Sequence, residues 1–234
     1  MARFFHDVDT SSKLDFGRSS HLPPSSCYNA NMYNFESQDF FDQLYNDANG
    51  QIERVPWSRP HTNPHLQAWL DREQINGAGK SALVVGCGLG DDAEELARRG
   101  FQVVAFDLSE TAISWAKQRF PTSPVHYTVM DMFKHPDSWA SRFAFVLEIN
   151  IVQAFPLSRR NLAIGVETQF VAPDGELLVI CHRRVQHDHM PLGPPWPMSR
   201  IEIDQYAQNG LQPVSIEAYQ DGIPRFRAHF RRAR

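Results

Sequence analysis

A glycine-rich turn between two short apolar runs constrains this chain more than any other feature. Residues 82–85, Ala-Leu-Val-Val, have the length and composition of a buried parallel strand, and residues 86–90, Gly-Cys-Gly-Leu-Gly, follow directly. Residues 91–99 predict a helix because acids open the segment and arginines close it. A second strand is predicted over 102–106. This order predicts a βαβ unit with a ligand site at the helix N-terminus.

The residues around this unit narrow the class of ligand. Asp107 closes the second strand, where a carboxylate accepts hydrogen bonds from ribose hydroxyl groups. A dinucleotide site needs a small residue at position 91, but Asp91 and Asp92 stand there and would repel a pyrophosphate. No Gly-Lys-Ser/Thr sequence ends the turn, which excludes a Walker-type phosphate site. A cationic nucleoside without phosphate fits better, and S-adenosylmethionine is such a ligand.

The rest of the chain continues this alternation and then departs from it. Further strands are predicted over 125–129, 143–147 and 176–180, and helices over 111–119 and 159–170. A capped helix over 199–209 then precedes a hairpin of 214–219 and 226–230. The predicted fold class is therefore α/β, with a mostly parallel sheet, a C-terminal antiparallel hairpin and helices on both faces.

The predicted organisation is one domain with an N-terminal arm. Residues 1–34 are rich in Ser, Asn and Pro and form a flexible arm that could dock over the site, with simple disorder as the other interpretation of 1–25. Residues 35–234 form the domain. Within it we expect an N-terminal helical cover (35–76), a cofactor-binding core (77–184), a proline-rich lid (185–198), and a final helix and hairpin (199–234).

Composition excludes several classes of protein. The mean hydropathy is −0.43 and no long apolar run occurs, which argues against a membrane span. The net charge of −4 disfavours nucleic acid as a partner. Three cysteines without metal spacing form no disulfide framework, and the N-terminus lacks a secretory signal, so we expect a cytoplasmic protein.

Two later strand ends carry further acids. Asp131 follows the third strand and could accept a hydrogen bond from an adenine amino group, with Met132 and Phe133 against the ring. Glu148 ends the fourth strand and is expected at the mouth of the site, beside the reactive end of the cofactor. Ligands bind at the carboxyl ends of strands in such sheets, so these positions are candidates for cofactor binding.

These motifs resemble the class I S-adenosylmethionine-dependent methyltransferases over about residues 75–234. The Gly86, Cys87, Gly88 and Gly90 positions match that family's G-x-G-x-G sequence. The resemblance implies a Rossmann-like sheet, S-adenosyl-L-methionine as cofactor and S-adenosyl-L-homocysteine as product. It also assigns Asp107 to the ribose, with Leu108 beside it, and Asp131 to the adenine side.

A shorter segment upstream resembles the thiopurine and halide/thiol methyltransferase group. Residues 41–45, the Val-Pro-Trp sequence that ends at Trp57, and residues 63–66 are similar to the entry segment of that group. The resemblance implies that Trp57 covers the methionine end of the cofactor and that Phe41 and Tyr45 line the approach, with Tyr33 of the arm among the substrate-binding candidates. The run 148–153, Glu-Ile-Asn-Ile-Val-Gln, departs from the Asp and Arg or Tyr usual there.

The remaining candidates lie after the fourth and fifth strands. His182 is the best-placed general base, and Asn150 can orient a substrate without deprotonating it. Gln153, Arg183 and Trp196 are candidates for substrate binding, with Trp196 on the proline-rich lid. His182 with His187, Asp188 and His189 matches no compact zinc pattern, so we expect no metal.

The predicted function is methylation of a small molecule. Charge is neutralised when a sulfonium gives up its methyl group, so catalysis needs alignment, desolvation and a deprotonated acceptor. Sulfur or another soft nucleophile is favoured as acceptor because a thiol ionises near neutral pH. N- or O-methylation of a secondary metabolite is one alternative, and a non-catalytic S-adenosylmethionine-binding regulator is another. A monomer is slightly favoured over an oligomer.

Overall fold

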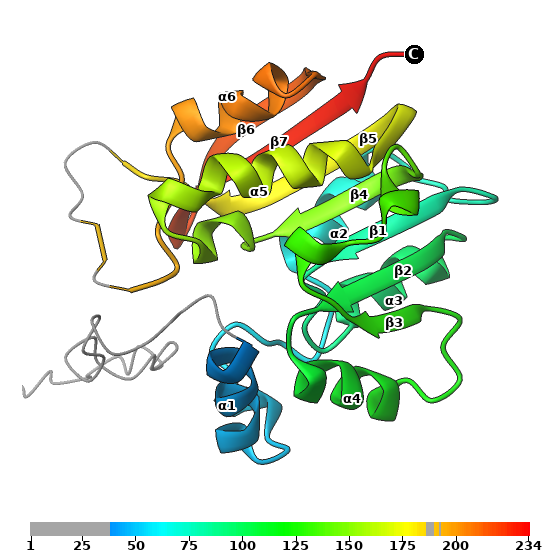
Figure 1. The fold of residues 1–234 in the computed structure, drawn as a ribbon, viewed down its shortest axis with the longest axis vertical. Helices are drawn as coiled ribbons and strands as arrows, with labels where there is room; N and C mark the ends of the chain where they lie inside the picture. The colour runs from blue at the N-terminus through cyan, green and yellow to red at the C-terminus, as the bar shows by residue number, and fades with distance from the viewer. Residues whose placement is uncertain (1–37, 186–189, 192) are drawn as a thin grey trace, which may run out of the picture.

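The computed structural model describes residues 38–185, 190–191 and 193–234. Its centre is a sheet of seven strands in the order β3-β2-β1-β4-β5-β7-β6 (Figure 1). The strands are β1 (Ser81–Val85), β2 (Gln102–Asp107), β3 (His126–Val129), β4 (Phe143–Ile149), β5 (Val171–His182), β6 (Leu211–Asp221) and β7 (Ile223–Arg232). The helices are α1 (Gln38–Ala48), α2 (Pro64–Arg72), α3 (Asp91–Arg98), α4 (Glu110–Arg119), α5 (Leu157–Phe170) and α6 (Arg200–Gln208). Short 3-10 helices are η2 (Ile52–Arg54), η3 (Met132–Lys134), η4 (Asp137–Trp139) and η5 (Val152–Ala154).

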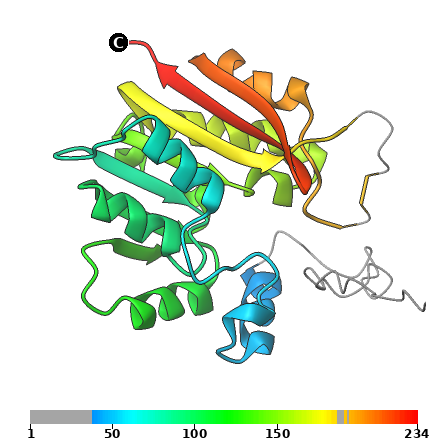
Figure 2. The same ribbon diagram turned by 180° about the vertical axis from the view of Figure 1, so that it is seen from behind.

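The strand directions confirm the predicted fold class. Strands β1 to β5 run parallel, and β7 lies antiparallel between β5 and β6. Helices α2, α3 and α4 pack on one face of the sheet and α5 and α6 on the other (Figures 1 and 2). The carboxyl ends of the parallel strands therefore meet at one edge, and Figure 1 shows α1 on the same side of the sheet as this edge.

The two hairpin strands extend beyond their predicted ranges, and the fifth strand starts earlier than predicted. The fifth strand was expected over 176–180 but begins at Val171, which pairs with Phe143. The ladder resumes only where Glu176 pairs with Phe145, so residues 172–175 bulge out of it. Asp174 in this bulge has a φ of 59°, a left-handed backbone. The Pro-Asp-Gly sequence of residues 173–175 therefore lies in a bulge within the strand.

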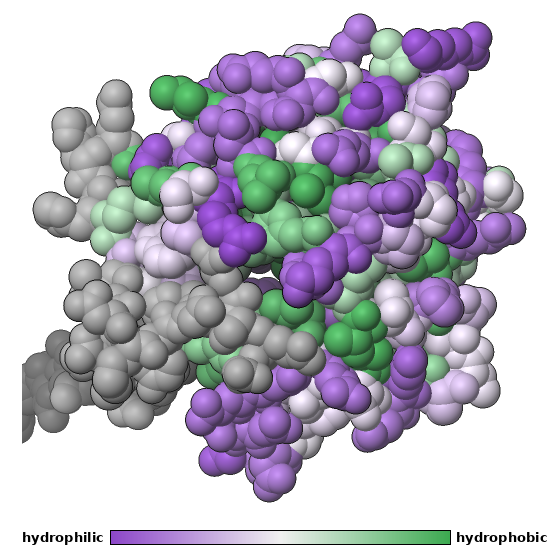
Figure 3. Space-filling view, viewed as in Figure 1, coloured by the Kyte–Doolittle hydropathy of each residue, from purple (hydrophilic) through white to green (hydrophobic). Residues whose placement is uncertain are grey.

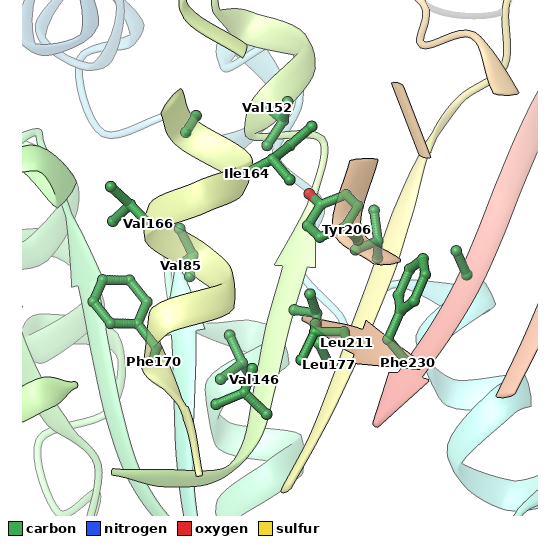
Figure 4. Close-up of a cluster of buried hydrophobic side chains, with 14 of the residues drawn as sticks. Val85, Val146, Val152, Ile164, Val166, Phe170, Leu177, Tyr206, Leu211 and Phe230 are labelled. Atoms are coloured by element: carbon green, nitrogen blue, oxygen red, sulfur yellow. The ribbon is translucent and has the colours of Figure 1, made fainter. Parts of the chain in front are cut away.

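The main core lies between α5, α6 and the sheet. Figure 4 shows side chains from β1, β4 and β5 meeting those of α5 and α6, with Val85, Val146, Ile164, Phe170 and Tyr206 among them. These residues are all less than 3% exposed. The surface on this side of the molecule is largely polar, and apolar side chains gather over α5 (Figure 3). Helices on both sides of the sheet thus explain the apolar runs of the central strands β1, β4 and β5.

Local sequence signals set the helix ends as expected. The Asn63 side chain accepts hydrogen bonds from the N–H groups of His65 and Leu66, and Pro64 occupies the first turn of α2. Ser199 and Glu202 form a reciprocal capping box on α6. The capping box confirms the predicted start of α6. None of the helices in the described part of the chain is long and apolar enough to cross a membrane.

Candidate active site

The glycine loop between β1 and α3 is shaped by three left-handed residues. Gly86, Gly88 and Gly90 have φ angles of 59°, 52° and 92°. A Cβ atom on Gly86 would overlap the end of the Ile151 side chain, and one on Gly90 would meet the ring of Tyr127. The loop is also tied to β2, because Cys87 N donates to the Phe106 carbonyl over 2.8 Å. Only glycine permits this backbone and this close packing.

Asp107 lies at the end of β2, against the glycine loop. Its Oδ2 accepts from Gly88 N at 2.8 Å and its Oδ1 from Ser109 N at 3.0 Å. Burial raises the pKa of this carboxyl group, and the backbone N–H groups of Ser109, Gly88 and Leu108 oppose that rise. A carboxylate accepts about four hydrogen bonds in all, so Asp107 keeps capacity for two ribose hydroxyl groups.

The two acids that open α3 do not present free charge to a ligand. Both oxygens of Asp91 accept from the Arg119 guanidinium, at 2.5 and 2.7 Å. Asp92 accepts from Asn63 N at 2.7 Å, and burial raises its pKa to about 6. The expectation that these acids repel a phosphate or attract a cation is therefore corrected. They fasten α4 and the start of α2 to α3.

An aromatic cluster packs beside the glycine loop. Tyr45 is 1% exposed, and its Oη would lie 3.3 Å from a Cβ atom placed on Gly88. Trp57 Nε1 donates to Tyr45 Oη over 2.9 Å, and the Trp57 ring centroid lies 6.0 Å from that of Phe41. Trp57 is 45% exposed and has free surface, whereas Tyr45 is its buried support.

Asp42 on α1, which the sequence interpretation missed, joins the helix that carries Phe41 and Tyr45 to the core of the domain. Its Oδ1 accepts from Ser109 Oγ at 2.5 Å and from Thr111 N at 3.2 Å. Both donors belong to the N-terminus of α4, where unpaired N–H groups favour a carboxylate. Ser109 N also donates to Asp107, so the same residue at the start of α4 binds both Asp42 of α1 and Asp107 of β2. No local pattern could reveal this contact, because its partners lie far apart in the chain.

The segment after β3 is arranged by Asp131. Its Oδ1 accepts from Phe133 N at 3.0 Å and caps η3, and Lys134 Nζ lies 3.4 Å from its other oxygen. Met132 is 5% exposed and packs into the main core, so its side chain is committed there. The Phe133 ring is half-buried, with the Arg159 guanidinium 4.5 Å from its centroid. Asp131 and Phe133 remain candidates for the adenine side.

Glu148 does not lie at the mouth of the site as expected. Its side chain is fully buried, and its Oε1 accepts from Ile151 N at 2.5 Å and from Val152 N at 3.0 Å. The carboxylate therefore shapes the loop after β4 and offers no exposed charge to a cofactor. Asn150 in this loop has a φ of 64°, and its buried Oδ1 has no hydrogen-bond partner.

Gln153 and His182 meet where β4 and β5 end. Gln153 is 1% exposed, and its Oε1 accepts from His182 N at 2.8 Å, while its Nε2 has no partner. Burial and the nearby Arg225 guanidinium lower the pKa of His182 to about 4. The imidazole is therefore neutral at pH 7 but a weak base.

Cations surround the end of β5. Arg225 pairs with His182 in the β5–β7 register and is 7% exposed, and its buried Nε has no partner. Arg183 likewise has a buried, unpartnered Nε, and its guanidinium lies 5.9 Å from the Phe226 ring centroid. The sequence interpretation included Arg183 but missed Arg225, which a strand pattern alone marks only as a polar position.

The predicted lid is described in part. Trp196 N donates to the Gln153 carbonyl over 2.9 Å, and Trp196 Nε1 donates to the Pro191 carbonyl over 2.9 Å. This contact brings Trp196 and Gln153 together at the end of β4. Residues 186–189 and 192, with His187, Asp188 and His189, lie outside the described residues, as do Tyr33 and the predicted arm. Among residues that are described, no three His, Cys, Asp or Glu side chains form a metal-binding group.

The residues at this edge fit S-adenosylmethionine. The glycine loop lets a ligand approach the backbone, and Asp107 retains acceptor capacity beside it. Asn150 Oδ1 and Gln153 Nε2 are buried polar atoms without partners, which a bound molecule could satisfy. Bound to these residues, such a cofactor would supply an electrophilic methyl group.

Comparison with known proteins identifies the family of this chain. A family model described as thiopurine S-methyltransferase matches residues 37–229, most of the chain. The chain is 26% identical over 192 residues to a probable thiol methyltransferase 2 from Arabidopsis thaliana, covering 78% of this chain and 80% of that protein. It is 27% identical over 170 residues to thiocyanate methyltransferase 1 from Brassica oleracea, covering 70% of each.

Solved structures support the same conclusion at the level of the fold. Magnesium protoporphyrin IX methyltransferase from Synechocystis with bound S-adenosylhomocysteine gives a TM-score of 0.65 at 16% identity, covering 84% of this chain and 98% of that one. The N-methyltransferase NodS from Bradyrhizobium japonicum, also with S-adenosylhomocysteine, gives 0.65 at 19% identity, covering 82% and 97%. The chain therefore belongs to the thiopurine S-methyltransferase family and is an S-adenosylmethionine-dependent methyltransferase.

Proposed function

We propose that the protein methylates the sulfur atom of a small thiol, or a related soft anion. The observation that carries this proposal is the chemistry at the end of β5. Arg225 and Arg183 place guanidinium groups there, each with a buried Nε that lacks a partner, whereas the nearby imidazole of His182 is a poor base. A site with cations and no strong base suits an acceptor that already ionises near neutral pH, and a thiol does so at about pH 8.5.

The cofactor is held at the other end of the edge. Asp107 accepts from the ribose hydroxyl groups, and the backbone of the loop at Gly86 and Gly88 approaches the methionine end. Trp57 covers that end, supported by Tyr45. Asp131 and Phe133 are assigned to the adenine side. These residues orient the cofactor and exclude water, which supports an in-line methyl transfer.

On the acceptor side, the chain's own residues stabilise the anion and position it. Arg225 and Arg183 lower the pKa of a bound thiol by attraction to its thiolate. Gln153 is oriented by its bond from His182 N, so its free amide N–H is available as a donor to the acceptor. Trp196, beside Gln153, contributes an apolar wall. The relatives named for thiol and thiocyanate methylation support this class of acceptor.

Replacement of Arg225 by methionine tests whether the guanidinium group binds the acceptor. We expect R225M to raise the KM of a thiol acceptor about 10-fold or more, the equivalent of one lost charge-assisted hydrogen bond, without changing the cofactor Kd. R225K should retain most of the affinity. R231M is the matched control, because Arg231 lies on the same strand near its other end, where it pairs with Glu176. Equal KM values for R225M and R231M would contradict the proposal.

The dependence of rate on pH separates this function from its alternatives. With thiol acceptors, kcat/KM should rise with pH and level off below the pKa of the free thiol, and H182N should leave this profile in place. Methylation of amines or alcohols alone would favour N- or O-methylation. Tight cofactor binding with no product from any acceptor would favour a non-catalytic regulator.

We also propose a monomeric, cytoplasmic protein that binds neither nucleic acid nor membrane, in line with its net charge of −4.

A further inference from the structure

Two glutamates are buried together beneath the acceptor side of the site. Glu148 on β4 and Glu167 on α5 are each 0% exposed. Glu148 Oε1 accepts from the N–H groups of Ile151 and Val152. Glu167 Oε2 accepts from Tyr206 Oη at 2.7 Å. The second oxygen of each carboxyl group, Glu148 Oε2 and Glu167 Oε1, is buried without any partner.

The surroundings cannot neutralise two carboxylates. Arg160 on α5 attracts Glu148, but this guanidinium is 1% exposed and is already paired with Glu202 on α6 at 2.5 Å. The same guanidinium donates to the carbonyl groups of Phe155 and Trp196. Among the described residues, the titratable groups that interact with the pair are Tyr206 from α6, Arg160 from α5 and Cys181 from β5. An uncompensated second charge in such a place is strongly disfavoured, so one of the two groups is neutral.

Hydrogen bonding decides which group is neutral. Glu148 accepts two backbone N–H bonds and is attracted by Arg160, and both effects favour its carboxylate. Glu167 has one bond, from the Tyr206 hydroxyl, and is repelled by Glu148. Burial raises the pKa of both groups, but the two N–H donors and Arg160 limit the pKa of Glu148 to about 7, so Glu148 ionises first and Glu167 keeps its proton.

We propose that Glu148 and Glu167 act as a buried acid pair in which Glu167 keeps the proton and ionised Glu148 fixes the loop 149–153. The proton on Glu167 removes the repulsion between the two carboxyl groups. It also supplies a hydrogen-bond donor in a place where Glu148 Oε2 and Glu167 Oε1 have no partner. Glu148 and Glu167 are thus positioning residues, since neither is exposed to a substrate.

The loop held by Glu148 touches the cofactor loop. Glu148 binds the N–H group of Ile151, and the Ile151 side chain fills the space beside Gly86 that a Cβ atom would otherwise occupy. One turn later the Gln153 carbonyl accepts from Trp196 N, and its side chain accepts from His182 N. The carboxylate therefore sets both the contact with the cofactor loop and the position of the acceptor side. This role in catalysis rests on the proposed function, whereas the protonation of Glu167 does not.

The protonation is tested by stability in the absence of substrate. A carboxyl group whose pKa is raised by folding loses stability as pH rises above its unfolded value of about 4.3. E167Q imitates the neutral acid and lacks this loss. We expect the Tm of E167Q minus that of the wild type to increase from pH 5 to pH 8. Infrared spectra of the wild type at pH 8, above the pKa of about 7 of Glu148, should show the carbonyl stretch of a neutral carboxyl group that E167Q lacks. A Tm difference that stays constant with pH, or no such band, would overturn the assignment of the proton.

The positioning role is tested by a pair of variants at position 148. E148A removes the acceptor for Ile151 and Val152, so we expect kcat to fall about 10-fold or more while the KM for the acceptor changes less. E148Q keeps an acceptor oxygen and should recover most of kcat. Circular dichroism shows that each variant is folded, and saturating cofactor, set by the Kd from calorimetry, keeps each variant loaded. Equal kcat values for E148A and the wild type would overturn the positioning role. If the wild type methylates nothing, the proposed function fails, yet the stability and infrared results still decide the proton.

Discussion

Replacement of Gly86 by alanine tests how the cofactor loop and the loop after β4 depend on each other. Gly86 has a φ of 59°, and an alanine there pays about 1–2 kcal/mol for the left-handed backbone. Its Cβ would also overlap Ile151 Cδ1 and lie 2.8 Å from Cγ1, and such overpacking costs about 1–3 kcal/mol. G86A should therefore lower the free energy of unfolding by about 2–5 kcal/mol.

The double variant G86A/I151A separates the two costs. Truncation of Ile151 removes the overlap but leaves the backbone strain, so the double variant should be about 1–3 kcal/mol more stable than the sum of the two single effects. Urea unfolding followed by circular dichroism measures all three variants and the wild type. Additivity within about 0.5 kcal/mol would refute the contact between the two loops.

Substitutions at three further residues test other parts of the structure. D107A should weaken cofactor binding about 100-fold in calorimetry, because two hydrogen bonds to a charged acceptor are lost; unchanged affinity would remove Asp107 from the site. W57A should weaken cofactor binding about 10-fold and W57F less, since phenylalanine keeps an aromatic cover; equal losses would show that the ring does not matter. Hydrogen bonds and charges of His229 and Arg231 lower the pKa of Glu176 to about 2. The ionised carboxylate therefore stabilises the folded protein above about pH 4.3, and this stabilisation is lost as pH falls toward 2. E176Q should abolish this part of the acid sensitivity, and an unaltered Tm profile between pH 5 and 2 would contradict the pairing.

The contact between the glycine turn and Asp107 could be predicted from sequence because its signals are local. The glycine turn and Asp107 lie within one βαβ unit, and a regular βαβ geometry places them together. The start of α2 was predictable for the same reason, since Asn63 and Pro64 act on their own helix. Such features depend on neighbours in the chain and little on the rest of the fold.

The acceptor half could not be predicted, because burial there depends on distant partners. Glu148 was expected at the mouth of the site, yet its side chain points to the face that α5 covers. Asp91 was interpreted as a free charge because Arg119, its partner, lies on the next helix. The role of Glu167 arises only when α5, α6 and β4 are packed together. A single sequence gives the type of a residue at a strand end but not the groups that will face it.

One measurement tests directly whether this enzyme methylates sulfur. The protein is incubated with S-adenosylmethionine carrying a labelled methyl group, and with matched small thiols, alcohols and amines. Mass spectrometry then detects the labelled products and S-adenosylhomocysteine. We predict that S-methylated thiol and S-adenosylhomocysteine form in equal amounts, with slower or no transfer to the matched alcohols and amines. Transfer to an alcohol or amine in preference to every thiol, or none to any thiol, would contradict the claim.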